Sequence, residues 1–449
     1  MTTRTRMATR KAATSLKEQT HRTFSSLKLR NYRLYFIGQT ISLCGTWMQS
    51  VAQALLVLTL AGPNEMGIEL GIVMGLQFAP VLFLAPFGGV LADRFPKRRI
   101  LFLTQTVAGL LALTLGVLVA TGAIRIWMLY LLALGLGLVS AIDNPARQTF
   151  VHEMVGRAQL SNAVMLNSIT VNLSRVIGPA AAGLIVAQLG LAPCFIINGL
   201  SFGAVLVCLG MMRDGELRRS APVKAAKGQL REGFRYAWNT RILRDVLIMM
   251  TLIGTLTYEF SVSLPLLAHV AFPGSAAQVA AGVATLMSVM GVGAVVGGLV
   301  AAGRRGATVR ALTIGAFGFG VSVLLVAVSP TLLWASLAMG VVGYYSVIFT
   351  SYSNALLQVS SAPHMRGRVM ALWTMAFVGM TVVGAPIVGW LGQVAGPRWS
   401  LVVGALAAVA AGLVGLDAVR SNVRAPVVMS GDTDSMPAIV RAVGQEGPA

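Results

Sequence analysis

Twelve apolar stretches of about twenty residues divide this 449-residue chain, and they restrict its fold more than any other feature. A helix needs about 20 apolar residues to cross the hydrocarbon core of a bilayer. Only 11% of the residues are charged, whereas a soluble protein has about a quarter. The sequence therefore predicts an all-α integral membrane protein. The expected spans are 34–60, 69–91, 99–121, 126–146, 161–188, 192–212, 244–271, 278–302, 308–328, 331–355, 366–392 and 399–420.

The positive charges lie almost entirely on one side of the expected spans. Of the 35 Lys and Arg residues, 32 fall in the tails and in alternate loops; Arg125 and Arg398 fall on the other side and Arg175 lies within a span. Cytoplasmic loops carry such an excess, so both termini are expected in the cytoplasm. This placement also explains the net charge of +20 by contact with membrane lipid, without a nucleic-acid partner.

A polar segment in the middle of the chain separates six spans from six. An internal repeat supports two related halves, because Gly88 to Ala92 matches Gly297 to Ala301 and Pro179 matches Pro386 at offsets near 208 residues. Parallel halves of this kind occur in major facilitator transporters. The predicted parts are a basic cytoplasmic tail (1–33), an N-terminal six-helix bundle (34–212), a cytoplasmic linker (213–243), a C-terminal six-helix bundle (244–420) and a disordered cytoplasmic tail (421–449).

The segment Gly88 to Arg99, between the second and third spans, places a carboxylate and four cations within seven residues. It resembles the loop 2–3 signature of the major facilitator superfamily, although Pro96 replaces the usual glycine. The alternative is an ordinary basic cytoplasmic loop. The resemblance implies a cytoplasmic gate between the halves. The residues assigned to it are Gly89, Asp93, Arg94, Arg98 and Arg147, with Asp93 expected to meet the end of the eleventh span or one of these cations.

Three charged residues within the spans are candidates for coupling transport to protons: Glu259, Arg175 and Asp143. A charge inside the membrane is costly, so it is by default a functional candidate. Glu259 and Arg175 are expected at similar depth, where they could pair, and Asp143 is the second candidate for carrying the proton. Two structural alternatives stay open. Arg175 could pair with Asp143 or a carbonyl group, and Glu259 could be a carboxylate exposed to water on the outer side.

Polar residues of the first span recur every three or four positions and so share one helical face. This face is expected to line a substrate cavity, and hydrogen bonding between helices is the alternative. Asn167, Asn172 and Tyr258 are further candidates for the cavity wall. The residues of the polar face are Gln39, Ser42, Thr46, Gln49 and Gln53.

The fifth span contains Gly178, Pro179 and Gly183, which would allow close helix packing and a bend. This resembles the Gly-Pro signature of facilitator antiporters, with Ser174 and Ala182 where glycines are usual.

Ile142 to Gln148, Arg366 to Met370 and Gly45 to Gln49 resemble the facilitator branch that contains the bacterial enterobactin exporter and related multidrug efflux proteins. The resemblance implies a monomeric antiporter in the bacterial inner membrane that exports a small amphiphilic molecule (a drug, siderophore or metabolite) by alternating access. An importer of the same fold is the alternative; an enzyme or receptor is disfavoured by the short loops and the absence of catalytic clusters. The sequence has no phosphate-binding motif and no metal-ligand spacing, so no cofactor is expected.

Overall fold

The structure is a computed structural model that describes residues 25–217, 229–303 and 307–420. Within them, twelve helical segments are long and apolar enough to cross a membrane, which confirms the predicted number. The tail 421–449 and most of the tail 1–33 lie outside the described residues. The helices of the N-terminal half are α2 (Arg30–Leu60), α3 (Met66–Arg94), α4 (Lys97–Ala120), α5 (Ile126–Leu189) and α6 (Ala192–Gly210), after the short η1 (Ser25–Lys28).

The linker contributes the short η2 (Asp214–Glu216) and the surface helix α7 (Gln229–Asn239). Glu232 of α7 pairs with Arg368 at 2.7 Å, which fixes α7 to the C-terminal half. The helices of that half are α8 (Arg241–Leu256), α9 (Phe260–Val270), α10 (Ala276–Gly303), α11 (Val309–Val328), α12 (Leu332–Ser360), α13 (Arg366–Thr374), the π-helical η3 (Met375–Gly379), α14 (Thr381–Val394) and α15 (Pro397–Arg420).

Four spans differ from simple continuous helices. The long α5 contains the fourth and fifth spans, joined through Gly156 at φ 67°, a left-handed conformation that favours glycine. The seventh span is divided into α8 and α9, and the eleventh into α13, η3 and α14. The predicted loop from Gly88 is also shorter than expected, because α3 continues to Arg94 and only two residues precede α4.

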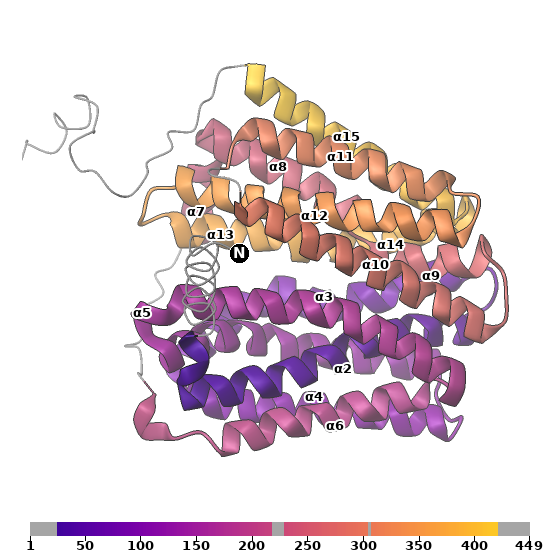
Figure 1. Ribbon diagram of the computed structural model, residues 1–449, viewed down its shortest axis with the longest axis horizontal. Coiled ribbons are helices and arrows are strands. Elements are labelled where there is room, and N and C mark those ends of the chain that lie inside the picture. The colour runs from indigo at the N-terminus through magenta and orange to yellow at the C-terminus, as the bar shows by residue number, and fades with distance from the viewer. Residues whose placement is uncertain (1–24, 218–228, 304–306, 421–449) are drawn as a thin grey trace, which may run out of the picture.

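The helices form two bundles that lie side by side, α2 to α6 in one and α8 to α15 in the other (Figure 1). We call the end that carries the turn at 95–96 and the linker the basic end, and the end that carries the turns at 61–65 and 395–396 the far end. The bundles meet along two symmetry-related helix pairs, α3 with α14 and α5 with α10. The repeat explains this arrangement, because α3 corresponds to α10 and the second part of α5 corresponds to α14.

Contacts between the bundles are closest toward the far end. Gly67 and Gly389 approach so closely that a Cβ atom added to Gly67 would lie 2.2 Å from the Gly389 carbonyl oxygen. Gln393 joins the bundles by hydrogen bonds, since its Oε1 accepts from the Gly67 backbone N–H at 2.9 Å and its Nε2 donates to the Pro63 carbonyl at 3.2 Å. Glycine and one amide side chain therefore form a tight seal at this end.

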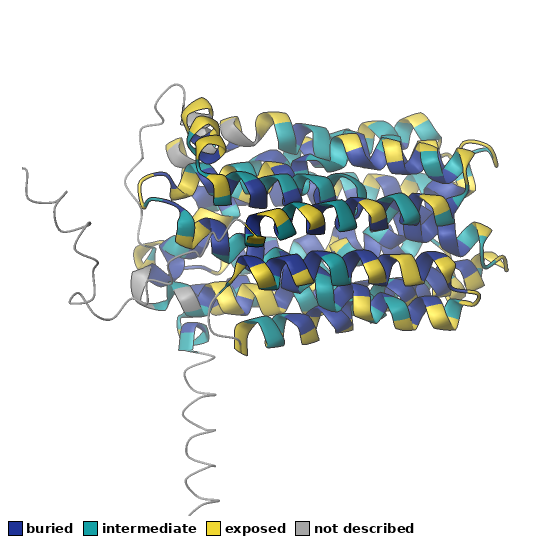
Figure 2. Cartoon of the chain, turned by 90° about the horizontal axis from the view of Figure 1, so that it is seen from above, coloured by how far each residue is buried: buried dark blue, intermediate teal, exposed yellow. Residues whose placement is uncertain are grey.

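The same helix faces separate toward the basic end. On α5, the Val176 carbonyl accepts a hydrogen bond from Ser288 of α10, but Ile169, two turns nearer the basic end on this face, is 46% exposed. On α10, Gly291 packs against α5, whereas Leu299 is 71% exposed. Figure 2 shows how buried and exposed positions alternate along the helices. The bundles are thus joined at the far end and apart at the basic end.

Candidate substrate cavity and its charged groups

A cavity of ≈ 320 Å³ lies between the two bundles, near the middle of the spans. Its wall combines a carboxylate, a guanidinium group, aromatic rings and methionine side chains. Such a mixture suits an amphiphilic ligand, because apolar walls supply contact area and a few polar groups orient the molecule. The residues central to the argument are Trp47, Arg175, Tyr258, Glu259, Phe377 and Thr381.

The break between α8 and α9 places Glu259 in this cavity. The backbone N–H groups of Thr257 and Tyr258 both donate to the Ile253 carbonyl, so the regular helix ends there. Two side chains then hold the break in place: the Thr257 hydroxyl donates to the Gly404 carbonyl at 2.7 Å, and the Tyr258 hydroxyl donates to the Ser346 carbonyl at 2.8 Å. Glu259 is only 3% exposed, and its Oε1 has no hydrogen-bond partner among the described residues. This burial contradicts the alternative of a water-exposed outer carboxylate.

Arg175 lines the same cavity from the second part of α5. Its guanidinium carbon lies 5.0 Å from the centre of the Trp47 ring, a cation–π contact. Its Nε is buried without a hydrogen-bond partner in the described part of the chain. Glu259 and Arg175 therefore line one cavity, and each has one buried side-chain atom without a hydrogen-bond partner among the described residues. The alternative pairing of Arg175 with Asp143 is wrong, because Asp143 has another partner.

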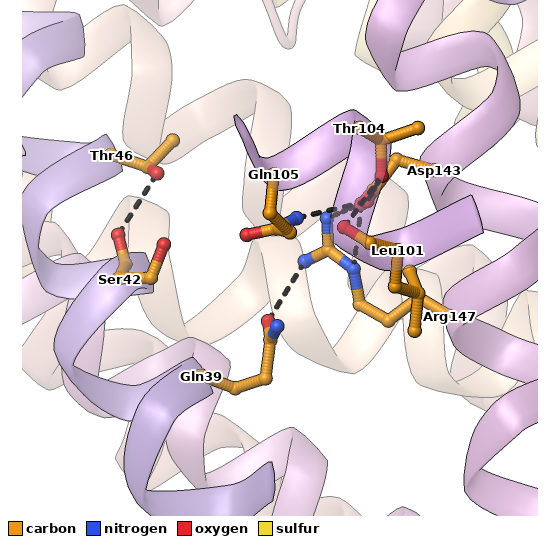
Figure 3. A network of polar contacts seen from close by, with 8 residues as sticks. All are labelled: Gln39, Ser42, Thr46, Leu101, Thr104, Gln105, Asp143 and Arg147. Atoms are coloured by element: carbon orange, nitrogen blue, oxygen red, sulfur yellow. Dashed lines mark hydrogen bonds and ion pairs between the residues drawn. The ribbon is translucent and has the colours of Figure 1, made fainter. Parts of the chain in front are cut away.

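Asp143 lies in a polar network inside the N-terminal bundle, as Figure 3 shows. Its carboxylate accepts from Thr104 at 2.7 Å, from Gln105 at 2.9 Å and from the Arg147 Nε at 3.0 Å. Arg147 continues the network to Gln39 at 3.2 Å. These contacts satisfy Asp143 and tie α2, α4 and α5 together. They favour a structural role and make Asp143 a weaker candidate for the proton carrier than Glu259.

The polar face of α2 largely binds neighbouring helices. Besides Gln39, Gln49 accepts from Asn198 at 2.6 Å and Gln53 donates to Gln77 at 3.1 Å. These three residues do not line the cavity between the bundles, and the alternative of hydrogen bonding between helices describes their contacts.

Other members of the predicted cavity set also lie outside the cavity between the bundles. Ser42 is buried and accepts the Thr46 hydroxyl through its carbonyl oxygen at 2.9 Å. Asn167 and Asn172 are not among the residues that line this cavity; Asn172 donates to the Ser168 carbonyl on its own helix at 2.9 Å. Tyr258 does line it.

Two of the predicted gate residues, Arg98 and Arg147, make contacts within the N-terminal half and the start of the linker. Arg98 donates to the carbonyl oxygens of Leu209 and Gly210 at the end of α6 and to Asp214 at 2.6 Å. A cation at a helix C-terminus is favourable, so Arg98 secures α6. Arg94 is exposed at the end of α3. The surroundings of Gly89 and the side chain of Asp93, with its expected pairing, lie outside the described parts.

The residues expected to allow close packing in the fifth span lie at helix contacts. A Cβ atom added to Gly178 would lie 2.5 Å from the Cβ of Trp47 on α2. One added to Gly183 would lie 2.6 Å from the Cβ of Ala284 on α10, across the two bundles. Pro179 lies between them and lines the cavity. Small residues here bring both neighbouring helices close to α5.

Several important residues were not anticipated from the sequence. Lys97 and Glu153 form a buried ion pair at 2.7 Å near the basic end, joining α4 to α5. Gln393 seals the far end, and Phe377 packs edge-on against Tyr258 with ring centres 4.9 Å apart. Lys97 and Glu153 both lie in predicted loops of the basic end, and this placement was the sequence signal for the ion pair. No periodic pattern distinguishes Gln393 or Phe377 from other residues of the eleventh span.

Two pseudo-symmetric six-helix bundles around a central cavity with a buried carboxylate and a guanidinium group define a membrane transporter of the major facilitator type. The chain belongs to the Transmembrane secretion effector family, whose sequence profile matches residues 21–441. It is therefore a multi-pass membrane transporter of a bacterial family and not an enzyme.

Individual relatives are distant. The chain is 26% identical to the enterobactin exporter of Salmonella typhimurium over 85% of this chain and 91% of that protein. It is 27% identical to the staphyloferrin A transporter of Staphylococcus aureus over 54% of this chain and 60% of that protein. It is 29% identical to an uncharacterized transporter of the same type from Bacillus subtilis over 44% of this chain, which spans only 47% of that relative.

Solved structures agree in fold. A transporter of the POT family in complex with a thioalcohol-conjugated peptide gives a TM-score of 0.71 at 11% identity, over 88% of this chain and 97% of that chain. A bacterial homologue of the human lysosomal transporter Spinster, in an inward-facing and unoccupied conformation, gives 0.63 at 15% identity, over 87% and 97%.

Proposed function

We propose that this protein is a proton-coupled exporter of a small amphiphilic molecule, located in the bacterial inner membrane with its basic end in the cytoplasm. The observation that carries the coupling is Glu259, a buried carboxylate whose Oε1 has no hydrogen-bond partner among the described residues. An ionised carboxylate in apolar surroundings is costly, so it must bind a proton or meet a cation. Arg175 in the same cavity wall supplies such a cation.

Alternating access would switch Glu259 between binding a proton and pairing with Arg175. In one conformation Glu259 is neutral and the ligand occupies the cavity; in the other Glu259 pairs with Arg175 and releases its proton. The charge asymmetry between the two ends supports cytoplasmic orientation of the basic end, since 32 of 35 cations lie on that side. The enterobactin exporter and the staphyloferrin A transporter make a siderophore a reasonable first substrate to test.

The test uses purified protein in liposomes with an imposed pH gradient and a panel of siderophores and amphiphilic drugs. We expect wild type to drive a substrate uphill, whereas Glu259→Gln exchanges it without concentrating it. Asp143→Asn is the matched control on the second carboxylate. The folded fraction of this variant should retain coupling. Uphill transport by Glu259→Gln at the wild-type rate would show that Glu259 is not the carrier. Gradient-independent uptake by wild type would refute proton coupling altogether.

A further inference from the structure

A second cavity, of ≈ 180 Å³, lies inside the N-terminal bundle, and we call it the amide chamber. It is enclosed by α2, α3, α4, the first part of α5 and α6, and Ser261 of α9 also lines it. Four carboxamide side chains and three hydroxyl groups supply its polar lining, and the described residues that line it include no charged side chain. The polar residues are Thr46, Gln49, Ser50, Gln53, Gln77, Asn198 and Ser261.

The carboxamides of the amide chamber retain unused hydrogen-bonding groups. Gln49 accepts from Asn198, and Gln53 donates to Gln77. Each of the three glutamines thus uses one of its two amide atoms. The other amide atom of each of these three glutamines has no protein partner in the described part of the chain. None of them is among the sealed, unpartnered atoms, so they face open space. A polar atom that faces a cavity normally pairs with water or with a ligand, which indicates that something other than the protein pairs with them.

The amide chamber adjoins the cavity between the bundles. Trp47, Met74, Phe78 and Ser261 line both, so these four side chains are the wall between them. Methionine is flexible and adapts to irregular ligands. Trp47 also contacts Arg175. A molecule in the central cavity therefore has a route into the amide chamber past a wall of two aromatic rings and one flexible side chain.

We propose that the amide chamber is a second binding subsite, which takes one uncharged, ring-sized arm of the transported molecule bearing hydrogen-bonding groups. The volume supports this size, because a cavity of about 150 Å³ in another protein holds benzene. The unused amide atoms select an arm with donors and acceptors. The uncharged lining excludes an ionised arm, since a buried charge without a partner is strongly unfavourable. This inference rests on the proposed function only in taking the ligand of the amide chamber to be part of the transported molecule.

The test measures binding without transport, so it can fail independently of proton coupling. Full-length protein in lipid nanodiscs is titrated with 4-fluorobenzamide, and binding is followed by fluorine NMR. We expect saturable binding of 4-fluorobenzamide. Fluorobenzene, which lacks the amide, and 4-fluorobenzoate, which carries a charge, should each bind at least about tenfold more weakly.

Variants locate the binding site. Ala112 lines the amide chamber and is 2% exposed, so Ala112→Leu fills it and should weaken 4-fluorobenzamide binding at least about tenfold. Thr114→Leu adds similar bulk to an exposed position of the same helix and should leave binding unchanged. Gln53→Leu, a second and milder change, should reduce the preference for the amide over fluorobenzene.

Glu259→Gln separates the two hypotheses. It should bind 4-fluorobenzamide like wild type even though coupled transport is lost. The proposal is overturned if wild type shows no saturable binding, as expected for a chamber that holds only water. It is also overturned if well-folded Ala112→Leu binds as tightly as Thr114→Leu, because the probe would then occupy the central cavity.

Discussion

Substituting Gly67 by alanine should disturb the seal between the bundles at the far end. The added Cβ would lie 2.2 Å from the Gly389 carbonyl oxygen, 1.2 Å short of the 3.4 Å at which ordinary van der Waals contact begins. The carbonyl oxygen is a backbone atom and the Cβ is fixed rigidly to the other helix backbone, so neither atom can rotate away. Relief requires α3 and α14 to move apart, and overpacking of this kind costs about 1–3 kcal/mol.

This cost falls only on the conformation in which the far end is closed. A conformation that is open at the far end lacks the contact, so Gly67→Ala should favour it by about 5- to 150-fold. The assay is a distance measurement by electron paramagnetic resonance in nanodiscs, with spin labels at Asn64 and Ala395, which are exposed on opposite sides of the seal. The three native cysteines are replaced beforehand. We expect a new population at longer distance.

Gly75→Ala is the matched control on the same helix and interface. A Cβ atom added there would lie 3.5 Å from the nearest atom of Pro386, an ordinary contact. It should leave the distance distribution as in wild type. If Gly67→Ala gives the wild-type distribution, or if both variants shift equally, the steric reasoning is refuted.

Two further predictions concern polar contacts. Gln393→Ala removes two hydrogen bonds between the bundles and should shift the same spin-label distances in the direction of opening, by about 1–2 kcal/mol. Lys97→Met leaves Glu153 as an unpaired buried charge and should destabilise the protein by about 3–5 kcal/mol, measured as loss of thermal stability in detergent. Lys97→Met combined with Glu153→Leu should recover most of this stability; a double variant no more stable than Lys97→Met would contradict the assignment.

The number of spans was predictable because hydrocarbon thickness sets the length of every apolar stretch. The break before Glu259 was not, since hydropathy is continuous there and the break depends on carbonyl groups of Gly404 and Ser346 from distant helices. The repeat likewise predicted two bundles but not which polar residues would cross between them. Spacing placed the glutamines of α2 on one face, but spacing cannot tell whether partners such as Asn198 satisfy that face.

Counting residues along the spans predicted Glu259 and Arg175 at similar depth, because helical rise converts sequence distance directly into depth. In the structure both residues line one cavity. Their roles stay predictions. The amide chamber could not be foreseen, as its lining comes from six helical segments and arises from their packing alone.

The separation of the bundles toward the basic end also has an electrical consequence. A conducting aqueous opening on that side would confine the voltage drop to the sealed part of the protein. Beyond Glu259 this part is the length of α9, 11 residues or roughly 16 Å. A proton passing between Glu259 and the far side would then cross most of the membrane field, worth about 2.3 kcal/mol per 100 mV. Under the proposed coupling, membrane potential would drive transport even where the pH is equal on both sides.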